Sequence, residues 1–386
     1  MYSSRKLLAN AVAVIAGFIS APTALGTNMP DVSQTAPIAL LVDVQSGQTL
    51  LSQNADRRFI PASITKVMSA YVAFELLAAG KLSLDQEFAM SNEAAESWYR
   101  TGSTMFLEPG EPVPVDLLLK GICAVSANDG SIVLAEGAAG SVEAWVAMMN
   151  ATAQKLGMRS SHFATPNGWP DDGQTFTTAR DLEKLAKAMI TSHPEYYATY
   201  FGQEGLRHNG FAQANHDPIS GIIDGADGIK TGYTNQAGHG FLGSAARDGS
   251  RLIMVLGGID TEQRRATIAR EFVEWGFAGF ERRRMYSTGD QVATARVQNA
   301  DQSSIPLISE QPINVVMPTD YTGDVTLNVI YEGPLKTPIA QGEKVAELEI
   351  LVDGLPPARV PLTAGETINR AGTLQRIFNA FQSWIS

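Results

Sequence analysis

The sequence predicts an α/β domain that contains a helical subdomain, followed by a small all-β domain and a terminal amphipathic helix. Residues 35–284 carry strand patterns at both ends and helical patterns between them, which is typical of one α/β unit. Residues 285–366 contain short alternating segments separated by turns bearing Asp, Gly and Pro, as all-β domains do. Residues 367–386 repeat apolar side chains at three- and four-residue steps, so a helix would gather them on one face.

Within residues 35–284 the order of the elements constrains the sheet. Two strands flank the turn at residues 45–48, which is a strand–turn–strand signal. The later elements are expected as helices at 63–77, 115–119, 142–156, 179–190 and 267–277, and as strands at 227–232, 240–246 and 251–258. Because strands open and close the segment, the sheet must be assembled from both of its ends. The second domain is expected to hold strands at 292–297, 313–317, 325–331, 345–352 and 358–362.

Size and composition exclude several classes of protein. A chain of 386 residues suits two or three domains, and its net charge of −11 disfavours nucleic acid, which needs a basic patch. One cysteine excludes an intramolecular disulfide, and five histidines without Cys/His spacing give no visible zinc site. We therefore expect no nucleic-acid partner, no metal and no cofactor.

The first 26 residues have the pattern of a secretory signal peptide. Arg5 and Lys6 precede an apolar run at 7–19, which is too short to span a bilayer and is followed by small residues. An uncleaved anchor or a core helix is the alternative. The pattern predicts export of the mature protein.

The predicted terminal helix at 367–386 suits the headgroup boundary of an anionic membrane. Its only charged residues are Arg370 and Arg376. Its apolar face comprises Ala371, Leu374, Ile377, Phe378, Phe381, Trp384 and Ile385. The alternative is an ordinary helix that packs on the protein itself.

The first candidate catalytic motif is the segment from Pro61 to Lys66. Pro61 favours a helix start, which places Ser63 in the first turn and Lys66 one turn later on the same face. A serine hydroxyl is a weak nucleophile until a base removes its proton, and a lysine can do so if burial and nearby positive charge lower its pKa. Alone, the pattern also fits an exposed serine and lysine at a helix start.

Two further motifs carry groups suited to the same chemistry. Ser126 and Asn128, in a segment that reads as a turn or loop, can face one cleft, where Ser126 relays a proton and Asn128 holds a substrate amide by two hydrogen bonds. Lys230, Thr231 and Gly232 stand on a predicted strand. Lys230 and Thr231 can receive a carboxylate, and Gly232 lets a substrate backbone lie close. The backbone N–H of Tyr233 can complete an oxyanion hole with that of Ser63.

In this order the three motifs resemble the S-x-x-K, S-x-N and K-T-G signature of penicillin-interacting serine acyl enzymes. Within them the chain is similar to the low-molecular-mass penicillin-binding proteins that are D-alanyl-D-alanine carboxypeptidases. PASITKVMSAYV, GICAVSANDGSIVLAE, GMRSSHFATPNGW and DGIKTGYTNQAGHGFLGSA carry the likeness. It covers residues 35–285 in detail and extends less specifically to the β-rich domain and the terminal helix.

The resemblance implies a catalytic role for three residues. Ser63 would be the acylated nucleophile, Lys66 the base for acylation and Ser126 the proton relay. The implied fold is a penicillin-binding α/β domain over residues 35–284.

The resemblance also implies how a substrate is held. Asn128 would position the peptide, while Lys230 and Thr231 face the carboxylate of the terminal D-alanine. Arg264 matches an arginine of the family that helps to hold this carboxylate, although Arg265 stands beside it.

The function expected from the resemblance is removal of the terminal D-alanine from peptidoglycan pentapeptide stems by an exported enzyme at the periplasmic face of the inner membrane. β-Lactams would acylate Ser63 and inhibit it. A DD-endopeptidase acting on cross-linked peptidoglycan shares the motifs and stays open. A class A β-lactamase is less consistent, because residues 126–128 read SAN rather than SDN and no glutamate motif for deacylation is visible. A non-catalytic wall-binding protein would need a broken motif, and each of the three is intact.

Overall fold

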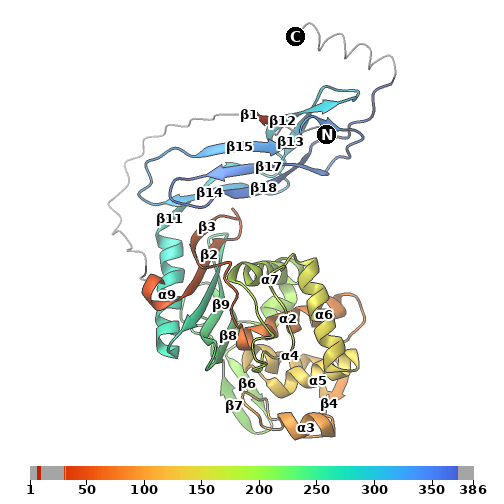
Figure 1. The fold of residues 1–386 in the computed structure, drawn as a ribbon, viewed down its shortest axis with the longest axis vertical. Helices are drawn as coiled ribbons and strands as arrows, with labels where there is room; N and C mark the ends of the chain where they lie inside the picture. Colours follow the sequence, from red (N-terminus) through yellow and green to blue (C-terminus); the bar gives the residue numbers. More distant parts are fainter. Residues whose placement is uncertain (1–6, 10–29, 31, 373–386) are drawn as a thin grey trace. The chain divides into compact units, whose positions relative to one another are not determined.

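The computed structural model describes residues 7–9, 30 and 32–372 (Figure 1). It divides into two compact units, which are described separately. The α/β unit comprises Asn28–Val42 and Leu51–Phe277, and the β unit comprises Met1–Thr27, Asp43–Leu50 and Ala278–Ser386. The predicted succession of an α/β domain and an all-β domain is confirmed.

The α/β unit is built around a five-stranded sheet with the order β3-β2-β10-β9-β8. The strands are β2 (Ile38–Asp43), β3 (Thr49–Gln53), β8 (Ala226–Thr234), β9 (Gly238–Arg247) and β10 (Ser250–Ile259). β9 pairs antiparallel with both β8 and β10. The N-terminal strands therefore join strands from the far end of the segment, as the order of patterns predicts.

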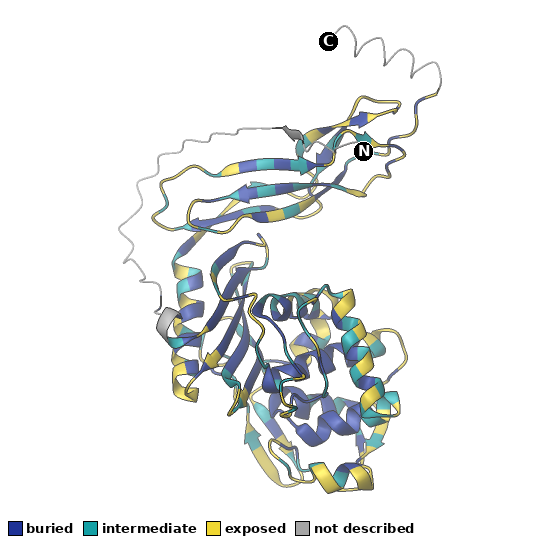
Figure 2. Ribbon diagram, viewed as in Figure 1, coloured by how far each residue is buried: buried dark blue, intermediate teal, exposed yellow. Residues whose placement is uncertain are grey.

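Helices cover both faces of this sheet. On one face lie a 3₁₀ turn, η1 (Ala62–Thr65), and the helices α2 (Lys66–Ala78), α4 (Val115–Ala124), α5 (Asn128–Ala139), α6 (Val142–Lys155) and α7 (Ala179–Ser192), while α9 (Glu262–Ala278) covers the other (Figure 1). Figure 2 shows the strands of the sheet and the inner helices, α2 among them, as largely buried. Every residue from Lys66 to Phe74 is buried. A helix enclosed in this way is mostly apolar around its circumference, and the buried polar residues of α2, Lys66 and Ser69, have hydrogen-bond partners.

The shorter elements of the unit form its margins. They are α1 (Val32–Thr35), α3 (Asn92–Trp98), α8 (Pro194–Tyr200) and two small hairpins, β4 (Glu87–Ala89) with β5 (Pro112–Pro114) and β6 (Gly205–His208) with β7 (Phe211–Ala214). Among the described residues no single helix is long and apolar enough to cross a membrane, and only α5 with α6, bent by 88°, reaches that length and apolarity as a pair.

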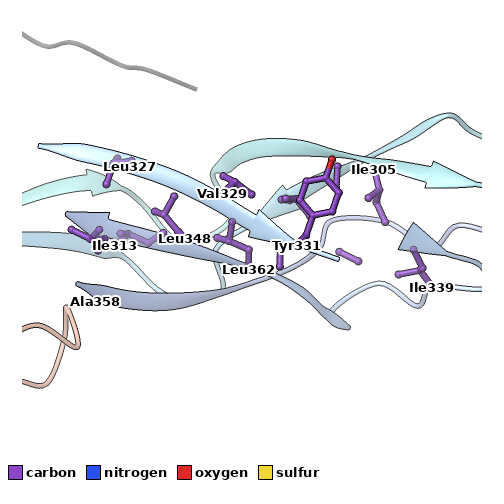
Figure 3. Close-up of a cluster of buried hydrophobic side chains, with 14 of the residues drawn as sticks. Ile305, Ile313, Leu327, Val329, Tyr331, Ile339, Leu348, Ala358 and Leu362 are labelled. Atoms are coloured by element: carbon purple, nitrogen blue, oxygen red, sulfur yellow. The ribbon is translucent and has the colours of Figure 1, made fainter. Parts of the chain in front are cut away.

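The β unit contains a seven-stranded sheet in the order β1-β15-β17-β18-β13-β12-β16 and a ribbon of β11 with β14. Their bounds are β1 (Leu7–Ala9), β11 (Phe280–Tyr286), β12 (Gln291–Gln298), β13 (Ser304–Ile308), β14 (Ile313–Pro318), β15 (Thr326–Tyr331), β16 (Leu335–Lys336), β17 (Lys344–Leu351) and β18 (Ala358–Ala364). Alternate residues such as Leu327, Val329 and Leu348 point into a single apolar core (Figure 3). β11 and β13 are not among the strands predicted from the sequence. β11 contains three arginines and β13 a proline, and both features weaken a strand pattern.

The structural boundary differs from the predicted one at residues 284/285, which falls inside β11. Within the β unit, Asp43 Oδ2 accepts a hydrogen bond of 2.8 Å from Arg282 Nε, and Gln48 Nε2 donates one of 2.8 Å to the carbonyl of Val316. Asp43–Leu50 therefore belongs to the β unit. The side chains of this hairpin tip bond to residues of the β unit, although the strands on either side of the tip belong to the sheet of the α/β unit.

The structure corrects the start of the terminal helix expected at residue 367. Ile368 forms a β-bridge with Ile339 and is fully buried, while Arg370 bridges Ala300 and donates from Nε to the carbonyl of Thr337 at 3.3 Å. Residues 367–372 are therefore extended and complete the β unit. The rest of the predicted helix, residues 373–386, lies outside the described residues, as does the predicted signal peptide apart from Leu7–Ala9, which pair with β15.

Candidate active site

Ser63 lies in η1, directly before α2. The amide of Ile64 donates to the carbonyl of Pro61 at 3.1 Å, which tightens the turn, and Ala62 adopts a left-handed φ of +49°. A non-glycine residue at such a φ costs about 1–2 kcal/mol, so the surrounding structure must hold it there. The predicted helix from residue 63 therefore begins with a 3₁₀ turn. The spacing prediction is confirmed, since Lys66 Nζ lies 3.0 Å from Ser63 Oγ.

Lys66 is a buried amine held by three oxygens. Besides Ser63 Oγ, its Nζ donates to Asn128 Oδ1 at 2.8 Å and to the carbonyl of Asn167 at 2.7 Å. The residue is 1% exposed. Burial, followed by the positive charge of Lys230, holds the pKa of Lys66 well below its usual range, and Asp129 opposes this shift.

The segment 166–168 completes the surroundings of Lys66, a role that its residue types do not indicate. Ser69 Oγ on α2 donates to the carbonyl of Pro166 at 2.6 Å, which places the next carbonyl, that of Asn167, at Lys66. Gly168 packs so closely that a Cβ there would lie 1.9 Å from the carbonyl oxygen of Ala62. Asn167 binds Lys66 through its backbone carbonyl. Every residue type has this group, so the sequence does not indicate which residue is the acceptor.

Ser126 and Asn128 stand where α4 gives way to α5. Ser126 has a φ of +63°, and its Oγ is buried without a hydrogen-bond partner among the described residues. Asn128 is the first residue of α5 and not part of a loop. Its Oδ1 is occupied by Lys66, and its Nδ2 donates to the carbonyl of Thr101 at 3.3 Å. Only one N–H of Asn128 is left for a substrate, so the expected pair of hydrogen bonds to a substrate amide does not fit this geometry.

Strand β8 brings Lys230, Thr231 and Gly232 to the other side of the site. Lys230 and Thr231 are buried, and burial lowers the pKa of Lys230 to about 8. A Cβ on Gly232 would lie 2.4 Å from the carbonyl oxygen of Pro61. The glycine is therefore required for β8 to pack against η1, which differs from the expected approach of a substrate backbone. Tyr233 is 52% exposed, and its ring stacks on His239.

The structure distinguishes the two adjacent arginines of α9. The side chain of Arg264 is 59% exposed and pairs with Asp260, whereas that of Arg265 is 4% exposed. Arg265 lies close enough to Lys230 to lower its pKa, after the larger effect of burial, and its own Nε is buried without a partner among the described residues. Arg265, and not the predicted Arg264, is thus the arginine on the Lys230 side. Consecutive helical residues point about 100° apart, which sequence matching alone did not resolve.

Two further residues, Cys123 and Trp169, lie near these groups. Cys123 on α4 is buried, which raises the pKa of its thiol to about 12 and removes its nucleophilic form at neutral pH. Trp169, 39% exposed, stands beside the site, since both its ring and Asn128 Nδ2 would lie 2.8 Å from a Cβ on Gly102. Within the described part of the chain no group of three or more His, Cys, Asp or Glu side chains is placed to hold a metal ion.

A serine hydroxyl beside a buried amine with a lowered pKa is the arrangement by which serine acyl-transfer enzymes work without a histidine. This fold and site define that class of protein.

Comparison with known proteins specifies the class further. Residues 24–261 match the D-alanyl-D-alanine carboxypeptidase family, and residues 280–370 match the C-terminal domain of penicillin-binding protein 5. D-alanyl-D-alanine carboxypeptidase DacA of Escherichia coli is 32% identical over 98% of this chain and 96% of its own, and DacF of Bacillus subtilis is 30% identical over 93% and 92%. The chain belongs to the D-alanyl-D-alanine carboxypeptidase family.

Solved structures agree with this assignment. Penicillin-binding protein 5 of Haemophilus influenzae superimposes with a TM-score of 0.76 at 29% identity, over 87% of this chain and 98% of that one. Penicillin-binding protein D2 of Listeria monocytogenes, solved in its ampicillin-bound form, superimposes with a TM-score of 0.56 at 30% identity, over 63% of this chain and 97% of that one.

Proposed function

We propose that this protein is a serine-type D-Ala-D-Ala carboxypeptidase that removes the terminal D-alanine of peptidoglycan pentapeptides through an acyl-enzyme on Ser63. The observation that carries the proposal is the 3.0 Å contact between Ser63 Oγ and the buried amine of Lys66. The family supports the substrate class, since its matched relatives are D-alanyl-D-alanine carboxypeptidases. The likeness to an ampicillin-bound structure supports β-lactams as covalent inhibitors of the same serine.

Acylation follows from the hydrogen bonds of Lys66. A neutral amine has two N–H groups and one lone pair. The oxygens of Asn128 and Asn167 accept the two N–H groups, which leaves the lone pair directed at Ser63 Oγ. Lys66 then takes the proton of Ser63 as its oxygen attacks the D-Ala-D-Ala carbonyl carbon. The C–N bond breaks, and we assign to Ser126 the transfer of that proton to the departing amine. Water later hydrolyses the ester and releases the shortened peptide.

The direct test compares two substrates in one experiment. A diacetyl-Lys-D-Ala-D-Ala peptide and a cross-linked muropeptide are incubated with the enzyme, and the products are separated. We expect release of free D-alanine from the first, with the cross-link of the second largely intact. Cleavage of the cross-link alone would establish the endopeptidase alternative, and rapid turnover of penicillin without D-alanine release would establish the β-lactamase alternative.

Recognition of the terminal carboxylate should depend on pH through Lys230. Its ammonium is present below a pKa of about 8 and is lost above it. Since kcat/KM reports ionisations of the free enzyme, kcat/KM for the acid substrate should fall as pH rises through this value. A substrate with an amidated C-terminus offers no carboxylate to bind, so its kcat/KM should lack this alkaline decline. Equal declines for both substrates, measured in parallel, would show that Lys230 does not bind the carboxylate.

We further propose that the protein is exported and held at the periplasmic face of the inner membrane by residues 373–386. The signal-peptide pattern at 1–26 supports export. Since Arg370 and Ile368 pack on the β unit, the anchoring segment begins after them, and Arg376 is its one charged residue. Burial of its apolar face would contribute about 25 cal/mol per Å², and one arginine on anionic lipid about 1 kcal/mol.

Truncation after Gly372 should abolish sedimentation with anionic vesicles and leave both the melting temperature and the activity on a small peptide unchanged. Truncation before Ile368 is the matched control, because it also removes the contacts of Ile368 and Arg370 and should lower the melting temperature. Phe381→Asp or Trp384→Asp in the full chain should weaken vesicle binding without affecting stability. A shorter protein, ending at Gly372, that still sediments with vesicles would disprove the anchor.

A further inference from the structure

Asp129 is a buried carboxylate that the proposed reaction does not use. It lies on α5 next to Asn128 and is fully buried. Its Oδ1 accepts hydrogen bonds from the amides of Met105 at 3.0 Å and Gly130 at 2.9 Å. Its Oδ2 accepts from Thr104 Oγ1 at 2.5 Å and from the amide of Leu107 at 3.1 Å. A buried charge is tolerated only when it is well hydrogen-bonded, and all four contacts are donors.

Three of these four donors belong to one segment, residues 101–107, which we call the strap. The hydroxyl of Thr104 donates to Asp129 and also accepts from the amide of Phe106 at 3.0 Å, and Phe106 has a left-handed φ of +62°. This conformation is unfavourable for a phenylalanine. Asp129 therefore helps to hold the strap in a shape its own sequence does not favour, together with Gln213, which donates to the carbonyl of Thr104 at 3.0 Å, and Asn209, which donates to the carbonyl of Phe106 at 2.8 Å.

The strap in turn fixes Asn128. The amide of Asn128 donates to the carbonyl of Ser103 at 2.8 Å, and its Nδ2 donates to the carbonyl of Thr101 at 3.3 Å. With Nδ2 fixed, Oδ1 points at Lys66 Nζ, 2.8 Å away. A continuous series of contacts thus runs from Asp129 through the strap and Asn128 to the amine beside Ser63.

We propose that Asp129 is a positioning residue for acylation, which holds the strap so that Asn128 orients the amine of Lys66 toward Ser63. The inference rests on the proposed function. Asp129 also acts at longer range as a charge, because among the described residues Lys230 on β8 and Asp129 on α5 are the charged groups that shift the pKa of Lys66. Asp129 raises the pKa of Lys66, whereas burial and Lys230 lower it. Asp129 therefore affects both the direction of the lone pair of Lys66 and the pH at which this lone pair becomes free of its proton.

The test measures the second-order rate of labelling by a fluorescent penicillin against pH. In Asp129→Asn one oxygen becomes an NH₂ group that faces N–H donors, so the strap loses its anchor. Misplacement of a catalytic group by about 1 Å can cost about 10²-fold, and we expect a loss of that order. Removal of the negative charge should also lower the pKa of Lys66, so the rise of the rate with pH should move to lower pH. A purely structural defect would reduce the rate without moving this rise.

Asp181→Asn is the matched control. Asp181 is also buried and receives hydrogen bonds from the amide of Ser160 and the hydroxyl of Ser161, both at 2.9 Å, but it anchors a different segment. We expect it to lower the melting temperature while the rate and its pH dependence stay close to wild type. A rate loss in Asp129→Asn no greater than in Asp181→Asn, or a pH dependence that does not move, would overturn the proposal.

Thr104→Val keeps the charge of Asp129 and removes one hydrogen-bond donor of the strap. It therefore separates the positioning effect from the effect of the charge on the pKa of Lys66, and it can be measured even if Asp129→Asn fails to fold. The rate should fall while its rise with pH stays in place. An unchanged rate in Thr104→Val would also overturn the positioning role. Failure of the wild-type protein to be labelled at Ser63 would instead contradict the proposed function.

Discussion

Replacement of Ser63 by alanine is expected to abolish labelling by fluorescent penicillin and to reduce D-alanine release by about 10⁴-fold or more. The acyl-enzyme requires an oxygen nucleophile in contact with the base. Ser63 Oγ, at 3.0 Å from Lys66 Nζ, supplies it. The fold should be unaffected, because the backbone of η1 and its packing against Gly232 do not involve this hydroxyl.

Ser141→Ala is a suitable control for this variant. Ser141 caps the start of α6 by accepting from the amide of Ala144 at 3.1 Å, so its loss should cost about 1 kcal/mol of stability without affecting labelling. Covalent labelling that persists in Ser63→Ala, with the modified residue identified by mass spectrometry, would place the nucleophile elsewhere.

Replacement of Lys66 by alanine should reduce the acylation rate by about 10²–10⁴-fold, the usual contribution of a general base. The variant should still bind the substrate carboxylate through Lys230, so KM should change much less than kcat. In the wild-type protein the acylation rate should rise with pH through the pKa of Lys66. Because the neutral amine is the reactive form and burial lowers this pKa, the rise should be complete at a lower pH than an exposed lysine would allow.

Lys230→Ala offers a second measurement on the same base. The positive charge of Lys230 is the second cause of the lowered pKa of Lys66, after burial. Its removal should raise the pKa of Lys66 and move the rise of the acylation rate to higher pH. A rise that stays in place in Lys230→Ala, or an acylation rate in Lys66→Ala near that of wild type, would contradict the assignment of Lys66 as the base.

Much of this site could be predicted because it rests on local geometry. Residues three apart at a helix start share a face, so the spacing of Ser63 and Lys66 predicts that they lie together, while the burial of Lys66 is known only from the structure. The two-sided assembly of the sheet follows from the order of strand patterns, and period-two alternation predicted most strands of the β unit. Residue spacing and strand alternation are properties of short segments, so they can be seen in the sequence without knowing how distant segments pack.

The sequence by itself determined that Ser63 and Lys66 stand one turn apart, the order of motifs and the succession of an α/β and an all-β unit. Only the tertiary structure decided what surrounds the pair. The contacts of Lys66 with Asn128 and Asn167 span 62 and 101 residues, and the second uses a backbone carbonyl that any residue type provides. The choice of Arg265 over Arg264 depends on how α9 is rotated against the sheet. Long-range contacts, helix rotation and burial arise only when distant segments pack. The pKa of Lys66, on which the proposed chemistry depends, is lowered mainly by burial and is therefore a property of the fold.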